Sequence, residues 1–342
     1  MVNRNPPAGS RKIPLGTDVL TAARQRIADT FDQFDRLCLS FSGGKDSTVM
    51  LHLVAEEARK RGRKFSILFI DWEVQYNATL AHVAAMRVRY SDCTEELFHI
   101  CLPMTTVNGV SAVQPEWTAW VLGVAWVRQP PTDSVTDPAY FPFYRSGMTF
   151  ESFVPAFNTW FAQGVRAATL VGIRADESLN RFLAISSRRK LRLSPDRPWT
   201  TLQPGGDCWS VYPLYDWHVT DIWRFHAVTG LPYNPVYDLM FRAGVSLAAM
   251  RICEPFGPEQ RKGLWLYHVL EPETWARACE RVSGAASGAK YVRSGRQRPE
   301  KPAHHTWQSY ACFLLDSLPQ PVAEHYRTKI AVYLHWYQER SS

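Results

Sequence analysis

The sequence lacks the paired cysteines that hold zinc ions or iron–sulfur clusters. Its 7 cysteines are scattered, and no two of them are separated by only two residues. This spacing excludes a zinc ribbon and a ferredoxin-like cluster site. An odd, scattered set of cysteines is typical of a reducing compartment, so we expect a cytoplasmic protein.

The chain also lacks a hydrophobic run long enough to cross a membrane. Its most apolar stretch, WTAWVLGVAWV at 117–127, is shorter than the ~20 apolar residues that a transmembrane helix needs. The first segment, 1–17, is polar and proline-rich, which predicts a disordered tail and not an export signal. We therefore expect no membrane segment.

A basic stripe with interleaved aromatic residues, typical of nucleic-acid binding, is missing as well. The formal net charge is nevertheless +7, which favours acidic partners such as nucleotides or nucleic acid. The charge is thus compatible with nucleic acid, but no motif indicates it. The length of 342 residues and the hydrophobic content of 46% describe a globular chain with an ample core.

What the sequence does contain is an alternation of strands and helices. Strands are predicted at 36–41, 65–71, 96–102, 167–173 and 209–214. Helices are predicted at 18–34, 47–61, 77–90, 149–163 and 219–230. Such alternation predicts an α/β fold, with a parallel sheet of about five strands covered by helices on both faces.

The pattern divides the chain into three parts. The α/β domain is predicted over 18–245, and it is interrupted at 103–148 by an irregular insertion rich in Trp, Pro and Tyr. This insertion has no clean period and is a candidate cover for a site. Beyond 245 the strand signals fade, so 246–342 is predicted to be a helical C-terminal region.

One loop combines the features of an anion site. It follows the first strand, precedes a helix, and consists of Ser42, Gly43, Gly44, Lys45, Asp46 and Ser47. Its glycines let backbone N–H groups approach an oxyanion, its serines add hydroxyl donors, and its lysine adds positive charge. The unpaired N–H groups and the dipole of the helix N-terminus favour the same ligand. The spacing does not match a Walker A loop.

This loop resembles the PP-loop of ATP pyrophosphatases and of the PAPS reductase-like group, whose fold is adenine nucleotide alpha hydrolase-like. In that superfamily the loop holds the pyrophosphate end of ATP or the matching anion of an activated sulfate. VGIRADESLNR at 171–181 resembles the second basic motif of the group, and 212–244 resembles another of its segments. From 250 onward the chain is similar to the immunoglobulin-binding regulator A branch, which has a ParB-like partner.

The resemblance implies roles for residues outside the loop. Besides the loop, the nucleotide-binding residues it implies are Phe69, Asp71, Gly172, Arg174, Glu177 and Ser178. Lys45, Arg174 and Arg181 would act in catalysis by offsetting the charge that grows on the leaving pyrophosphate. Asp71 would bind Mg²⁺ or a ribose hydroxyl, or else cap a helix. The turn at 234–238 would reach the nucleotide or brace the fold.

The chain departs from PAPS and APS reductases at the C-terminus. It lacks their Glu-Cys-Gly-Ile-His tail, and no cysteine follows Cys312. Cys253 is the only cysteine flanked by arginine in a plausible loop, so Arg251 and Cys253 are predicted to line a substrate pocket. Arg261 and Lys262 would extend that pocket. The alternative for Cys253 is a small packed residue.

Together these features predict an enzyme that uses ATP and Mg²⁺. An acceptor would attack the α-phosphorus, pyrophosphate would leave, and the unidentified acceptor would become adenylylated. The first alternative is a sulfonucleotide reductase or transferase that binds PAPS or APS, with Cys253 in a reductive role. The second is a nucleotide-sensing regulatory subunit without catalysis that acts with a ParB-like partner. The sequence offers no clear general base.

Overall fold

The computed structural model describes residues 16–111, 113–187, 190–206, 208–258, 260, 263–292, 301–318 and 320–341. Most of the predicted disordered tail at 1–17 lies outside these residues, and so do Arg261 and Lys262 of the predicted pocket.

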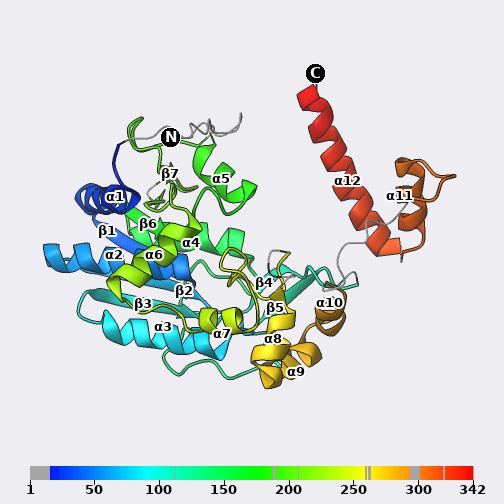
Figure 1. The fold of residues 1–342 in the computed structure, drawn as a ribbon, viewed down its shortest axis with the longest axis horizontal. Helices are drawn as coiled ribbons and strands as arrows, with labels where there is room; N and C mark the ends of the chain where they lie inside the picture. The colour runs from blue at the N-terminus through cyan, green and yellow to red at the C-terminus, as the bar shows by residue number, and fades with distance from the viewer. Residues whose placement is uncertain are drawn as a thin grey trace, which may run out of the picture.

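A six-stranded sheet in the order β3-β2-β1-β6-β8-β7 forms the centre of the molecule (Figure 1). Its strands are β1 (Arg36–Ser40), β2 (Phe65–Ile70), β3 (Thr94–Ile100), β6 (Ala167–Val171), β7 (Thr200–Leu202) and β8 (Cys208–Val211). The five longer strands run parallel, which confirms the predicted parallel sheet. The three-residue strand β7 joins the edge antiparallel to β8 and was not predicted.

Helices cover both faces of this sheet, as predicted. The helices of this part are α1 (Val19–Gln33), α2 (Lys45–Arg61), α3 (Asn77–Arg89), α4 (Phe150–Ala162), α5 (Leu179–Ser186), α6 (Val219–Thr229) and α7 (Val236–Arg242). Leu37 and Leu39 of β1 face a hydrophobic cluster shared with α1, α2, α3 and α6. Cys38 belongs to the other cluster, which contains residues of α4. Successive side chains of a buried strand point to opposite faces of the sheet, so a hydrophobic core forms on each face.

The insertion contains a short antiparallel hairpin that the sequence did not reveal. Its strands are β4 (Met104–Val107) and β5 (Glu116–Ala119), and they form a sheet of their own. Trp117 and Trp120 are buried in the same cluster as α4. The insertion thus adds to the core on one face of the sheet.

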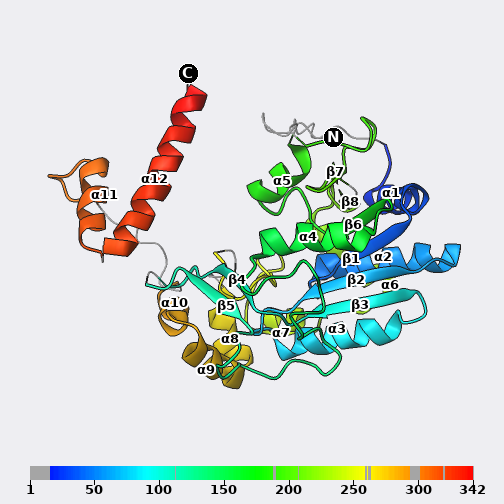
Figure 2. The same cartoon turned by 180° about the vertical axis from the view of Figure 1, so that it is seen from behind.

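The C-terminal part is helical, as predicted. Its helices are α8 (Trp265–Leu270), α9 (Pro272–Arg281), α10 (Ala285–Val292), α11 (Trp307–Asp316) and α12 (Gln320–Ser341). α8 and α9 pack beside the insertion, whereas α11 and α12 lie apart from the sheet in both views (Figures 1 and 2). Within the described ranges, no helix combines the length and the apolar character that a membrane crossing requires.

Candidate functional site

A cavity of about 300 Å³ lies where the carboxyl ends of β1 and β6 diverge. From β1 the chain continues to β2 on one side, and it returns as β6 on the other, so this is the switch point at which open α/β sheets bind ligands. The loop 42–47, the ends of β2 and β6, and the segment 250–254 all contribute to its wall.

The loop after β1 has the backbone geometry of an anion cradle. Gly43 adopts φ +70°, and a Cβ atom there would lie 2.8 Å from Cγ2 of Thr79 on α3. Helix α2 begins at Lys45, two residues earlier than predicted. Among the described residues, the N–H groups of Asp46 and Ser47 have no acceptor, and both residues line the cavity. Two donors are therefore available to a ligand at this helix start.

The two serines and the turn at 234–238 hold the loop in shape. The Oγ atoms of Ser42 and Ser47 are 3.0 Å apart, and the N–H of Gly44 donates to Oγ of Ser42. The buried Asn234 donates to the carbonyl of Gly43 at 2.9 Å, and the hydroxyl of Tyr237 accepts from the N–H of Lys45 at 3.0 Å. Asn234 therefore braces the loop, whereas Tyr237 also lines the cavity.

A buried charge network lies beside the cradle. Nζ of Lys45 is 2.9 Å from one oxygen of Asp46, and Nε of Arg174 is 2.5 Å from the other. Burial disfavours the charged form of Asp46, but the two cations outweigh it and lower the pKa of this carboxyl. Arg174 is only 4% exposed and does not line the cavity. It acts on the site through Asp46.

The end of β6 approaches the cradle closely. A Cβ atom on Gly172 would lie 3.1 Å from both the carbonyl oxygen of Asp46 and Cα of Ser47, so glycine is needed here. Glu177 and Arg181 line the cavity and form an ion pair at 3.2 Å. Ser178 instead caps α5, accepting from the N–H of Arg181 at 3.3 Å.

The predicted nucleotide contact of Phe69, through backbone groups near the end of β2, stays a prediction. The Phe69 side chain is fully buried in the cluster on the α2 face and contacts the ring of His99 edge-on at 4.9 Å. Its neighbours Leu68 and Ile70 line the cavity because alternate residues of a strand face opposite sides. Gln75, farther along, also lines it, and its buried Oε1 has no partner among the described residues.

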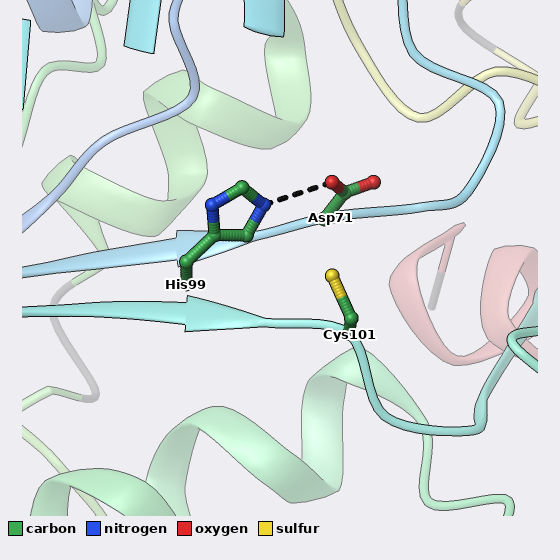
Figure 3. Close-up of side chains that lie close together, drawn as sticks. All are labelled: Asp71, His99 and Cys101. Atoms are coloured by element: carbon green, nitrogen blue, oxygen red, sulfur yellow. Dashed lines mark hydrogen bonds and ion pairs between the residues drawn. The ribbon is translucent and has the colours of Figure 1, made fainter. Parts of the chain in front are cut away.

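Asp71, predicted to bind magnesium, lies in a network of its own outside the cavity lining. Its side chain is fully buried, and one oxygen is 2.9 Å from Nε2 of His99 (Figure 3). Arg128 donates to both oxygens. These partners outweigh burial and lower the pKa of Asp71. Because Arg128 occupies both oxygens, we correct the prediction: this carboxylate is unsuited to binding Mg²⁺.

Cys101 lies next to this pair, and atoms of Asp71, His99 and Cys101 that are able to bind a metal are within 4.8 Å of one another (Figure 3). Burial, followed by the charge of Asp71, raises the pKa of the Cys101 thiol. A thiol that keeps its proton beside an arginine-bound carboxylate is a poor metal site. We interpret the cluster as structural.

Glu73, which follows β2, also has a structural role. It is fully buried at φ +64° and accepts from the N–H groups of Trp120 at 2.7 Å and Val127 at 2.9 Å. Arg281 of α9 also donates to it, at 3.2 Å. Asp71 and Glu73 therefore fasten the insertion and a C-terminal helix to the sheet.

The segment 250–254 closes the cavity from the C-terminal part. Arg251 and Cys253 line it, and the Cys253 thiol donates to Oε1 of Gln260 at 3.4 Å. Glu254 lines it too, and no sequence motif marked this residue. Its carboxyl accepts from the hydroxyl of Thr106 on β4, and burial raises the pKa of Glu254 to about 7.

Two family models match parts of the chain. The phosphoadenosine phosphosulfate reductase domain matches residues 36–108 and 159–243, and a domain of unknown function, DUF3440, matches 244–342. The chain is 55% identical over 334 residues to Uncharacterized protein YbdN of Escherichia coli (strain K12), which covers 96% of this chain and 82% of that protein.

Other proteins are less similar to the chain. Sulfate adenylyltransferase subunit 2 of Allorhizobium ampelinum is 27% identical over 223 residues, covering 60% of this chain and 58% of that subunit. The chain also matches a crystal structure of phosphoadenylyl-sulfate (PAPS) reductase from Candida auris in a phosphate complex. The two sequences are 15% identical, the TM-score is 0.37, and the match covers 68% of this chain and 94% of the other.

Proposed function

The chain belongs to the PAPS reductase-like family that includes YbdN, and we propose that its cavity binds ATP for cleavage between the α- and β-phosphates. The observation that carries this proposal is the cradle after β1. There, Asp46 and Ser47, whose N–H groups have no acceptor among the described residues, line one cavity together with Lys45. Such a cradle suits the terminal phosphates of a nucleotide.

The base would occupy the part of the cavity near the end of β2. Ile70 and Trp72 supply apolar wall there. Gln75 is 4% exposed, and its unpartnered Oε1 is an acceptor for the amino group of adenine. A glutamine amide pairs with the N6 and N7 edge of adenine, so this residue favours adenine over guanine.

The reaction we assign is attack by an acceptor on the α-phosphorus, with pyrophosphate as the leaving group. Lys45 and Arg181 would offset the charge on the phosphates, and Arg174 would act indirectly by holding Asp46. Magnesium would supply further neutralisation of phosphate charge. Both oxygens of Asp46 are paired with cations, as are those of Asp71, so we assign neither carboxylate to that ion.

Calorimetric titration of the full chain with ATP, with and without Mg²⁺, tests the proposal. Lys45→Ala removes a charged donor, so we expect the Kd for ATP to rise roughly 10- to 100-fold. Lys60→Ala is the matched control, because Lys60 lies near the other end of α2 with 73% of its side chain exposed. Failure of the unmodified chain to bind ATP under either condition contradicts the proposal.

A sulfonucleotide enzyme is the second candidate, because Cys253 lines the same cavity. The two reactions are distinguished by their products. Release of pyrophosphate from ATP supports the first candidate, whereas thioredoxin-dependent release of sulfite from PAPS supports the second. Nucleotide binding without either product would favour the regulatory alternative, for which a ParB-like partner stays a prediction.

A further inference from the structure

Three carboxylates line the cavity, and their partners differ. Asp46 is paired with Lys45 and Arg174. Glu177 is paired with Arg181 at 3.2 Å and lies 3.8 Å from Arg251. In the part of the chain that the structure describes, Glu254 has no cation as a partner, and the Thr106 hydroxyl is its hydrogen-bond donor. Glu254 thus differs chemically from the other two.

Because of this difference, Glu254 is the one of these three carboxyl groups that exchanges a proton near neutral pH. Burial raises the pKa of Glu254 to about 7, and the charge of Glu151 on α4 acts in the same direction, whereas the hydrogen bond from Thr106 opposes both. The cations that line the cavity, Lys45, Arg181 and Arg251, are engaged with the other two carboxylates. A general base works best when its pKa lies near the working pH.

We propose that Glu254 is the general base of this site, an inference that rests on the proposed ATP reaction. The Glu254 carboxylate takes the proton from the acceptor as the acceptor's lone pair attacks the α-phosphorus. The bond from that phosphorus to the bridging oxygen breaks, and its electrons leave with pyrophosphate. The products are the adenylylated acceptor, pyrophosphate and a protonated Glu254, which returns its proton to water.

This role restricts the acceptor to a protic nucleophile, an alcohol or an amine. Such a group carries a proton that must leave as its bond to phosphorus forms. A sulfate or carboxylate acceptor is already an anion near neutral pH and has no proton for Glu254 to remove. The inference therefore separates this chain from enzymes that adenylylate sulfate.

The position of Glu254 explains why the loop motif indicated no base. The residue belongs to the segment after 244, outside the reductase-domain match, and Thr106 of the insertion holds it in place. Neither part is near the cradle in sequence. Folding brings both to the cavity that the cradle lines.

The test measures pyrophosphate release from ATP and Mg²⁺ with hydroxylamine as the protic acceptor, over a pH range that spans the ionisation of Glu254. We expect the rate of the unmodified chain to rise with pH around a pKa of about 7. Glu254→Gln should lower turnover by roughly 10²–10⁴-fold and abolish this rise, with the calorimetric Kd for ATP unchanged.

A second variant separates a proton-transfer role from a structural one. Thr106→Val removes the hydroxyl that lowers the pKa of Glu254, so the rise in rate should move to higher pH with turnover retained at its plateau. A residue that only supports the fold would change thermal stability without moving the pH profile. An unmoved profile overturns the proposal.

Failure of this proposal is distinguishable from failure of the proposed function. If ATP binds but Glu254→Gln keeps full turnover and the same pH profile, Glu254 is not the base. Bound ATP that yields pyrophosphate with sulfate but not with hydroxylamine, or with neither, overturns the assignment as well. If ATP does not bind at all, the nucleotide proposal itself is wrong.

Discussion

Two buried charge networks lie at the ends of adjacent parallel strands. One of them lies at the cavity, and the other lies outside the cavity lining. After β1, Asp46 is paired with Lys45 and Arg174, and the loop that carries it lines the cavity. After β2, Asp71 is paired with Arg128 and His99 and lies outside the cavity lining. Both are carboxylates neutralised by arginine, so their charge alone does not distinguish them.

What distinguishes the two networks is the backbone around them. The cradle after β1 keeps N–H donors at a helix start that have no acceptor among the residues the structure describes. After β2, the neighbouring Glu73 accepts from two N–H groups of the insertion, and the network holds segments that are distant in sequence. A strand-end carboxylate therefore indicates a ligand site only when unpaired groups remain beside it.

The largest effect that we expect from a test of this comparison is on stability. Asp71→Ala leaves Arg128, whose side chain is only 14% exposed, without its carboxylate, which should lower the free energy of unfolding by about 3–5 kcal/mol. Asp92→Ala is the control, because Asp92 and its partner Arg59 are about half exposed, and its loss should lower stability far less. Urea unfolding measures both. Equal losses would contradict a structural role for Asp71.

The next effect concerns the close approach at Gly172. Gly172→Ala places a Cβ atom against the backbone of the cradle, so we expect ATP affinity to fall about 10-fold, with a cost in stability of about 1–3 kcal/mol. Gly164→Ala is the control, because Gly164 has φ +78° but open space around it. It should lower stability and leave ATP affinity unchanged. Calorimetry and thermal unfolding separate the two results.

A smaller effect, on the pH dependence of stability, distinguishes Glu254 from the paired carboxylates Asp46 and Glu177. Its pKa is about 7 when folded, against an ordinary value of 4.5, so the folded chain binds this proton more tightly than the unfolded chain. The stabilisation is complete below pH 4.5 and is lost as the pH rises through about 7. Glu254→Gln should flatten this decline in urea unfolding, whereas the surface variant Glu56→Gln should keep it. An unchanged decline contradicts the assignment.

The smallest expected effect is at Cys253. Its side chain lines the cavity, but the ATP reaction needs no thiol, so Cys253→Ser should leave both ATP affinity and pyrophosphate release unchanged. Calorimetry and a pyrophosphate assay measure these quantities. Loss of all turnover would contradict an ATP reaction that needs no thiol.

The sequence predicted the main elements well and the short ones poorly. The five parallel strands and the helices between them carry long apolar patterns, and the structure confirms them. β4, β5 and β7 have three or four residues each, and β4 and β5 lie in the insertion, which has no clean period. Their partners are set by tertiary contacts and not by local pattern.

Some of the predicted site residues line the cavity and others do not. Loop residues Ser42, Lys45 and Ser47 line the cavity, whereas Asp71 faces a different network because an insertion supplies Arg128. Glu254 was missed because an isolated glutamate in a loop has no distinguishing pattern. Its burial and its lack of a described cation partner become visible only in the folded chain.

The sequence by itself determined the strand, the glycine turn and the helix start of the cradle. These depend on local properties, such as the backbone freedom of Gly43 at φ +70° and the unpaired N–H groups of a first helical turn. Only the tertiary structure decided which carboxylates are paired with cations. It also decided which one lines the cavity with no cation partner among the residues that the structure describes. That outcome depends on desolvation and on charges from the insertion and the C-terminal part, which folding brings to the same end of the sheet.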